Sequence, residues 1–171
     1  MNLFRHFGFF LIAIHSVSVF AGGLPDWVLN PPTEEGMLAG ADCVRQSGLL
    51  MADRQQAIAN ARTQIAQQIE TRVSSLDEVV TLKVESAGKS ESQSSFKSVS
   101  KQLAEQSLAN TRIARVEQPQ TSEGNFICVL VQYGKEAMRT TFKSAVAAVA
   151  PKMDPADEAT LFRSFVKVKN Q

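Results

Sequence analysis

The stretch NFICVLVQY, residues 125–133, has the strongest strand pattern in this chain. Successive side chains of a strand point to opposite faces, so an almost continuous apolar run supplies apolar side chains to both faces. A strand that is buried on both faces usually lies at the centre of a sheet. We therefore expect residues 125–133 to form the central strand of the domain.

Neighbouring segments predict two further strands. Residues 111–117 form a weaker strand, and the turn-forming segment QPQTSEG (118–124) joins it to residues 125–133, which together indicate a hairpin. Residues 79–85 (VVTLKVE) alternate apolar and polar side chains. This alternation predicts a half-buried strand, as in an antiparallel sheet with one face in water.

Residues 36–44 (GMLAGADCV) predict a short strand nearer the N-terminus. The period of two places Met37, Ala39, Ala41 and Cys43 on one face. Gly40 lies on the other face, where the lack of a side chain indicates that another element packs closely.

Residues 50–74 form the clearest helix, because apolar side chains recur on one stripe at helical spacing. This stripe consists of Ile58, Ala61, Ile65, Ile69 and Val73. Further helices are expected from residue 96 and over 135–149, which Pro151 ends. A last helix should begin at Asp154, a preferred N-cap residue. A serine-rich loop is expected in the first half of 86–100. The expected fold class is α+β: a small, mainly antiparallel sheet of about four strands, packed against a long N-terminal helix, with C-terminal helices.

Residues 1–21 have the three-part pattern of a secretory signal peptide. Arg5 precedes an apolar run, and that run is too short to span a bilayer, which needs roughly 20 residues. We expect cleavage between Ala21 and Gly22, export to the periplasm and no direct membrane span. A lipoprotein signal needs a cysteine immediately after the cut, and Gly22 stands there instead, so a lipidated N-terminus is not expected.

Removal of residues 1–21 changes the charge and the chemistry of the chain. The full chain has 18 Lys and Arg against 17 Asp and Glu, and Arg5 leaves with the signal, so the mature formal charge is zero. Both histidines, His6 and His15, leave as well. Without histidine, most hydrolytic triads and most zinc sites are excluded. We therefore predict no enzyme, no catalytic residue, no metal and no cofactor, and the neutral charge argues against nucleic-acid binding.

Two cysteines, Cys43 and Cys128, remain in the mature chain. An even number of cysteines in an oxidising compartment allows one disulfide. Two buried free thiols are the alternative, since cysteine is often a small core residue. The pair is thus a predicted disulfide whose geometry the sequence does not fix.

Residues 22–35 contain several prolines, which predict an extended arm without regular helix. Trp27, the single tryptophan, lies in this arm. A lone large aromatic side chain usually buries area, so packing against the domain is favoured over contact with a partner. The expected organisation is a signal peptide at 1–21, this arm, an α+β domain at 36–150, and a C-terminal helix and tail at 151–171.

Several motifs in this order resemble the Lpp-twenty family of small bacterial envelope lipoproteins: the arm PDWVLNPP, the strand GMLAGADC, the long helix and the strand FICVLVQY. The helix match comprises Ala57, Ala59, Ala61, Arg62, Ile65, Ala66, Gln68, Ile69 and Val73. The resemblance covers roughly residues 25–149. It implies a few strands against a long helix and a relation to FlgP-like and FlgT-like flagellar envelope domains. It carries over no catalytic residues, and this chain lacks the family's lipidated cysteine.

These observations favour a non-enzymatic structural or assembly protein of the periplasm or cell envelope that acts through protein–protein contacts. The resemblance implies association with the outer membrane and the flagellum. Its expected partners are envelope proteins, among them flagellar disc or ring components, or a second copy. The alternative is a periplasmic binding module for a small apolar ligand or lipid, with a pocket between Trp27 and the long helix.

Overall fold

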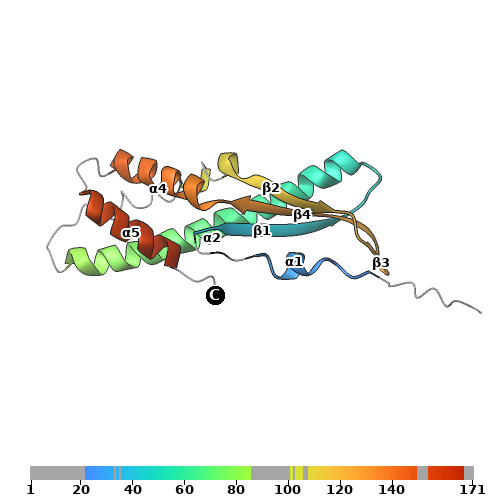
Figure 1. Cartoon of the computed structure of the whole chain (residues 1–171), viewed down its shortest axis with the longest axis horizontal. Coiled ribbons are helices and arrows are strands. Elements are labelled where there is room, and N and C mark those ends of the chain that lie inside the picture. The colour runs from blue at the N-terminus through green and yellow to red at the C-terminus, as the bar shows by residue number, and fades with distance from the viewer. Residues whose placement is uncertain are drawn as a thin grey trace, which may run out of the picture.

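The computed structural model describes residues 22–32, 34, 36–85, 101, 103–105, 108–149 and 154–167 (Figure 1). The side chains of 76–85, 148 and 149 are outside this description. The fold is α+β, as the sequence predicts. Its elements are α1 (Asp26–Leu29), β1 (Leu38–Arg45), α2 (Leu50–Glu85), β2 (Arg112–Glu117), β3 (Gln120–Thr121), β4 (Gly124–Tyr133), α4 (Lys135–Val149) and α5 (Pro155–Lys167).

Several predictions fall on residues outside this description: the signal peptide at 1–21, the loop at 86–100 and the stop at Pro151. The helix expected from residue 96 is described in part. Residues 101, 103–105 and 108–110 are helical, and Leu103 is fully buried.

The sheet is antiparallel, and β4 is its central strand. Its order is β1–β4–β2, and the short β3 pairs with the start of β4. Every residue of β4 from Ile127 to Val131 is buried, so the strand is covered on both faces. This confirms the prediction made from NFICVLVQY. The hairpin of β2 with β4 is confirmed too, and β3 lies within the predicted turn at 118–124.

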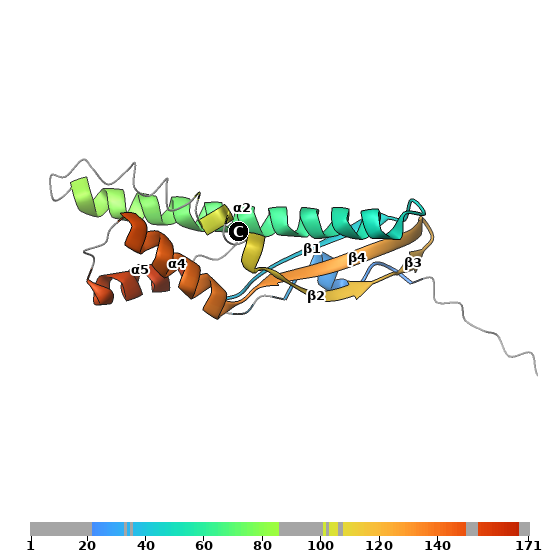
Figure 2. The same cartoon turned by 90° about the horizontal axis from the view of Figure 1, so that it is seen from above.

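The long helix α2 covers one face of the sheet, and α1 lies on the opposite face (Figure 2). All five residues of the predicted stripe on α2 are at most 4% exposed. They share a core with residues of β1, β4, α4 and α5, among them Leu38, Val129, Val131, Tyr133, Phe142 and Phe165. A smaller cluster on the α1 side holds Trp27, Ala39, Ala41, Cys128 and Leu130.

The strand predicted at 79–85 is wrong, because α2 continues as a helix to Glu85. Between Leu50 and Glu85 the sequence has no glycine or proline that would end a helix. Extending an existing helix fixes one residue for each hydrogen bond gained, whereas a new strand needs a partner. The penalty for β-branched residues in a helix is small, roughly 0.5 kcal/mol each.

The arm at 22–35 is not extended throughout, since Asp26–Leu29 form one helical turn, α1. Pro25 stands at its N-cap, where the missing N–H of proline costs no hydrogen bond. Asn30 ends the turn by donating its N–H to the carbonyl of Asp26, one residue before Pro31. Proline is excluded from the interior of a helix. A single turn between two prolines has almost no interior, so these prolines do not prevent it.

The two C-terminal helices form as predicted. Asp154 caps α5, with its carboxylate accepting the N–H of Ala156 at 2.7 Å. Phe142 of α4 packs against Phe162 and Phe165 of α5, with ring centroids 5.4 and 5.3 Å apart. These helices lie beside the C-terminal half of α2, beyond the end of the sheet (Figure 1).

Candidate interaction surface

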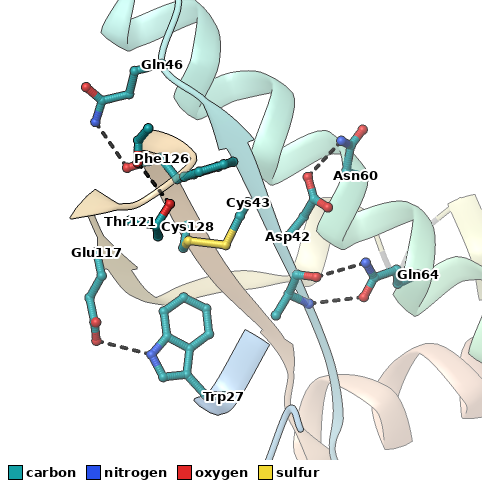
Figure 3. The surroundings of a disulfide bond; sticks show 12 residues. Trp27, Asp42, Cys43, Gln46, Asn60, Gln64, Glu117, Thr121, Phe126 and Cys128 are labelled. Carbon is teal, nitrogen blue, oxygen red and sulfur yellow. Dashed lines mark hydrogen bonds between the residues drawn. A yellow bond between two sulfur atoms is a disulfide. The ribbon is translucent and has the colours of Figure 1, made fainter. Parts of the chain in front are cut away.

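The edge of the sheet at β1 is closed by polar side chains of α2. Gln64 donates its amide N–H to the carbonyl of Ala41 at 2.9 Å and accepts the N–H of Ala41 at 3.1 Å. Gln68 donates to the carbonyl of Ala39 at 2.8 Å, one strand repeat away. Asn60 donates to the carboxylate of Asp42 at 2.8 Å (Figure 3). Gln64 and Gln68 thus occupy backbone groups of Ala41 and Ala39 with which another strand would pair.

The spacing of these residues explains the match between helix and strand. Asn60, Gln64 and Gln68 are four residues apart, which is about 6 Å along a helix. Two residues along a strand span about 6.6–6.8 Å. Gln64 and Gln68 therefore meet Ala41 and Ala39, two residues apart on β1. The sequence shows this line beside the apolar stripe, but its role was not predicted.

Gly40 of β1 lets α2 come close enough for these contacts. A Cβ atom at position 40 would collide with the backbone carbonyl oxygen of Ala61 on α2 and would lie 3.2 Å from Cβ of Gln64. The prediction of a close neighbour on this face of the strand is therefore confirmed.

The opposite edge of the sheet, formed by β2, is open. All six residues from Arg112 to Glu117 are exposed, and within the described part of the chain no strand pairs with the outer side of β2. Two of them are large and apolar: Ile113 is 39% exposed and Val116 is 36% exposed. We call Arg112–Glu117 the β2 edge. The two edges of the sheet thus differ: side chains of α2 bind the outer backbone of β1, whereas the β2 edge is available for pairing with another strand.

Trp27 fixes α1 to the α1-side face of β2. Its indole Nε1 donates to the carboxylate of Glu117 at 3.1 Å (Figure 3). Its ring centroid lies 6.0 Å from the guanidinium carbon of Arg115. Arg115 and Glu117 form an ion pair at 3.9 Å. Trp27 is 9% exposed, as expected for a side chain that packs against the domain. Its contact with a partner stays a prediction.

A hollow of about 430 Å³ lies beside Trp27. It is lined by Asp26, Trp27, Asn30, Pro32, Ala114, Arg115, Leu130 and Gln132. The expected pocket between Trp27 and the long helix is wrong, because the sheet lies between them (Figure 2). Trp27 packs on the face of the sheet that α2 does not cover.

The predicted disulfide between Cys43 and Cys128 is present (Figure 3). The two residues are direct partners in the β1–β4 ladder, with Cα atoms 4.0 Å apart. Directly opposite residues of an antiparallel pair bring their side chains together on one face. The bond joins β1 to β4 on the α1 side, and Cys128 is fully buried.

Two of the described carboxylates in the first part of the chain, Asp42 and Asp53, have structural partners. Asp42 is bound by Asn60. Asp53 is 6% exposed and accepts the N–H of Ser47 at 2.8 Å and its hydroxyl at 2.7 Å, which fixes the loop before α2. In the described ranges, no three His, Cys, Asp or Glu residues are placed to hold a metal ion.

Of the two residues at the expected cleavage site, the structure describes only the second, Gly22. Gly22 is exposed and lies near the carbonyl of Gln120 in β3, while Ala21 is outside the described residues. Among the helices that the structure describes, none has the length and apolar character needed to cross a membrane.

Comparison with protein-family models, with curated proteins and with solved structures found no match for this chain. The resemblance to the Lpp-twenty family therefore stays a proposal.

Proposed function

We propose that the mature chain is a non-enzymatic structural or assembly protein of the bacterial cell envelope that acts through protein–protein contacts. The observation that carries this proposal is the β2 edge. Unpaired backbone N–H and C=O groups along a strand are a template for pairing with another chain. Ile113 and Val116 add apolar area to that template, whereas β1 is closed by Gln64 and Gln68.

The disulfide supports an oxidising compartment such as the periplasm. Disulfides persist in exported proteins and are rare in reducing compartments. The signal-peptide pattern at residues 1–21 points to the same place, and the resemblance to the Lpp-twenty family favours an envelope assembly, with the flagellum as one candidate.

Chemical crosslinking in the cells that produce the protein tests this function. The tagged chain is purified from the envelope fraction after crosslinking, and the adducts are identified by mass spectrometry. The proposal predicts adducts with envelope proteins or with a second copy. A chain that stays monomeric and uncrosslinked in the envelope would contradict it.

The hollow beside Trp27 supports a second candidate, a binding module for a small ligand. Its volume of about 430 Å³ lies within the usual range of ligand pockets, about 300–1,000 Å³. Its lining includes Arg115 and Gln132, which an apolar ligand would deprive of water, so this candidate ranks second. Native mass spectrometry of the exported protein tests it, and a spectrum of the unliganded chain alone would count against it.

A further inference from the structure

The apolar side chains of the β2 edge lie on one face of the sheet. Ile113 is opposite Val131 of β4, and Val116 is opposite Val129. Directly opposite residues of an antiparallel pair share a face. Val129 and Val131 belong to the core under α2, so Ile113 and Val116 both lie on the α2 side.

The charged ends of the β2 edge lie on the other face. Glu117 is opposite Cys128 and binds Trp27, which places it on the α1 side. Arg112 is opposite Gln132, which lines the hollow beside Trp27. The edge therefore has a cation at one end and an anion at the other, with Arg115 between them, and all three lie on the α1 side.

A bulge makes this arrangement possible. The register of β2 against β4 shifts between Ile113 and Arg115. Ile113 and Val116 are three residues apart, and a regular strand would place them on opposite faces. The extra residue at Ala114 returns Val116 to the face of Ile113.

We propose that the β2 edges of two copies pair antiparallel about a two-fold axis that passes between Ala114 and Arg115, normal to the sheet. In this register Ile113 lies opposite Val116 of the second copy, and Arg112 lies opposite Glu117. Each pair occurs twice by symmetry, and the two residues of each pair share a face. This proposal rests on the proposed function and names its partner as a second copy of the chain.

The faces select this register over its neighbours. A slip by one residue sets Ile113 opposite Arg115 or opposite Glu117, an α2-side residue against an α1-side residue. Charges on an edge strand usually keep copies apart. Here the antiparallel order brings Arg112 to Glu117, so these two charges attract, while Arg115, which is 3.9 Å from Glu117 of its own copy, lies opposite Ala114 of the second copy. Trp27 holds the carboxylate of Glu117 in place at 3.1 Å before the second copy arrives.

The other edge of the sheet limits the assembly to two copies. Gln64 and Gln68 occupy backbone groups of β1, so the joined sheet ends at β1 on both sides. A two-fold interface is self-complementary and closes on itself. The result is one continuous sheet, β1–β4–β2–β2–β4–β1, with both α2 helices on the same side.

Sedimentation equilibrium of the mature, disulfide-bonded chain tests the pairing. The wild-type chain should form a dimer. Ile113→Lys should raise the dissociation constant at least about tenfold, a change of about 1.4 kcal/mol. The control Met51→Lys introduces the same lysine in place of a 64% exposed apolar residue of α2, outside the β2 edge, and should leave the constant within about twofold.

A charge exchange tests the register. Arg112→Glu alone and Glu117→Arg alone each set like charges opposite one another and should weaken the dimer. Mixed together, the two variants should form a heterodimer, because each altered charge then meets its opposite. If Glu117→Arg does not fold, Arg112→Glu against wild type still reports the contact, with equal unfolding midpoints as the check on folding.

Three results would overturn the pairing. They are a wild-type chain that is monomeric at about 500 μM, where even a complex of millimolar affinity is partly formed; a dimer that Ile113→Lys does not weaken; and a mixture that fails to restore association. A different envelope protein crosslinked to the chain in cells would leave the proposed function standing after any of these. The absence of every adduct would instead contradict the function itself.

Discussion

Replacement of Gln64 by leucine tests the closure of the β1 edge. The leucine keeps the approximate size of the side chain and the helix propensity of the position. It removes two hydrogen bonds, at 2.9 and 3.1 Å, and leaves the N–H and carbonyl of Ala41 without their partner. Because Ala41 is 5% exposed, water does not fully replace that partner.

The expected cost follows from these two bonds. A hydrogen bond contributes about 1 kcal/mol net, and leaving a buried group unpaired costs about 1–3 kcal/mol. We therefore expect Gln64→Leu to lower the free energy of unfolding by about 2 kcal/mol. With a urea dependence of about 2 kcal/mol per molar, the midpoint should fall by about 1 M.

Urea unfolding followed by the fluorescence of Trp27 measures this change, since Trp27 is the single tryptophan. Gln67→Leu is the matched control, because Gln67 is an exposed residue of the same helix. The control midpoint should stay within about 0.3 M of wild type, in keeping with surface substitutions. Equal midpoints for the two variants would refute the closure of β1 by Gln64.

Three further predictions concern stability. Gly40→Ala should lower the free energy of unfolding by about 3 kcal/mol or more through overpacking against α2. Gly23→Ala is the control, because open space surrounds Gly23, and equal unfolding midpoints for the two variants would contradict the close approach. Replacing Cys43 and Cys128 together by alanine should cost about 4–5 kcal/mol in the chain-entropy model. An unchanged midpoint, or free thiols detected by mass spectrometry in the protein purified without reductant, would contradict the bond. Burial raises the pKa of Tyr133 above its ordinary value of about 10. The neutral side chain therefore stabilises the fold fully below about pH 10, and this contribution to the free energy of unfolding is lost as pH rises through the raised pKa. It is the single tyrosine, so tyrosinate absorbance reports it directly, and titration in the folded protein at the ordinary value would count against this burial.

Local periodicity predicted the core of the fold. The stripe on α2 and the two-sided apolar run of β4 are signals within single segments, and both are confirmed. The strand at 79–85 failed because alternation over seven residues does not exclude a helix that has already started. The turn α1 was missed because proline is compatible with the first turn of a helix.

The interaction surface depends on contacts between distant segments, which sequence spacing alone does not specify. Trp27 meets Glu117 across 90 positions of sequence. Gln64 meets Ala41 only because α2 crosses the sheet at the β1 edge and because Gly40 allows close approach. The disulfide was predicted from compartment and parity, and its position in the ladder came from the register of β1 with β4.

Site-specific photocrosslinking in the cells that produce the protein tests the central claim, that this chain acts through contacts at the β2 edge. A photoreactive residue replaces Val116 in one variant and the exposed Lys143 of α4 in a control variant. The account predicts protein adducts from position 116 that are absent from position 143. No adduct from position 116, with the variant still folded and present at the wild-type level, would contradict it.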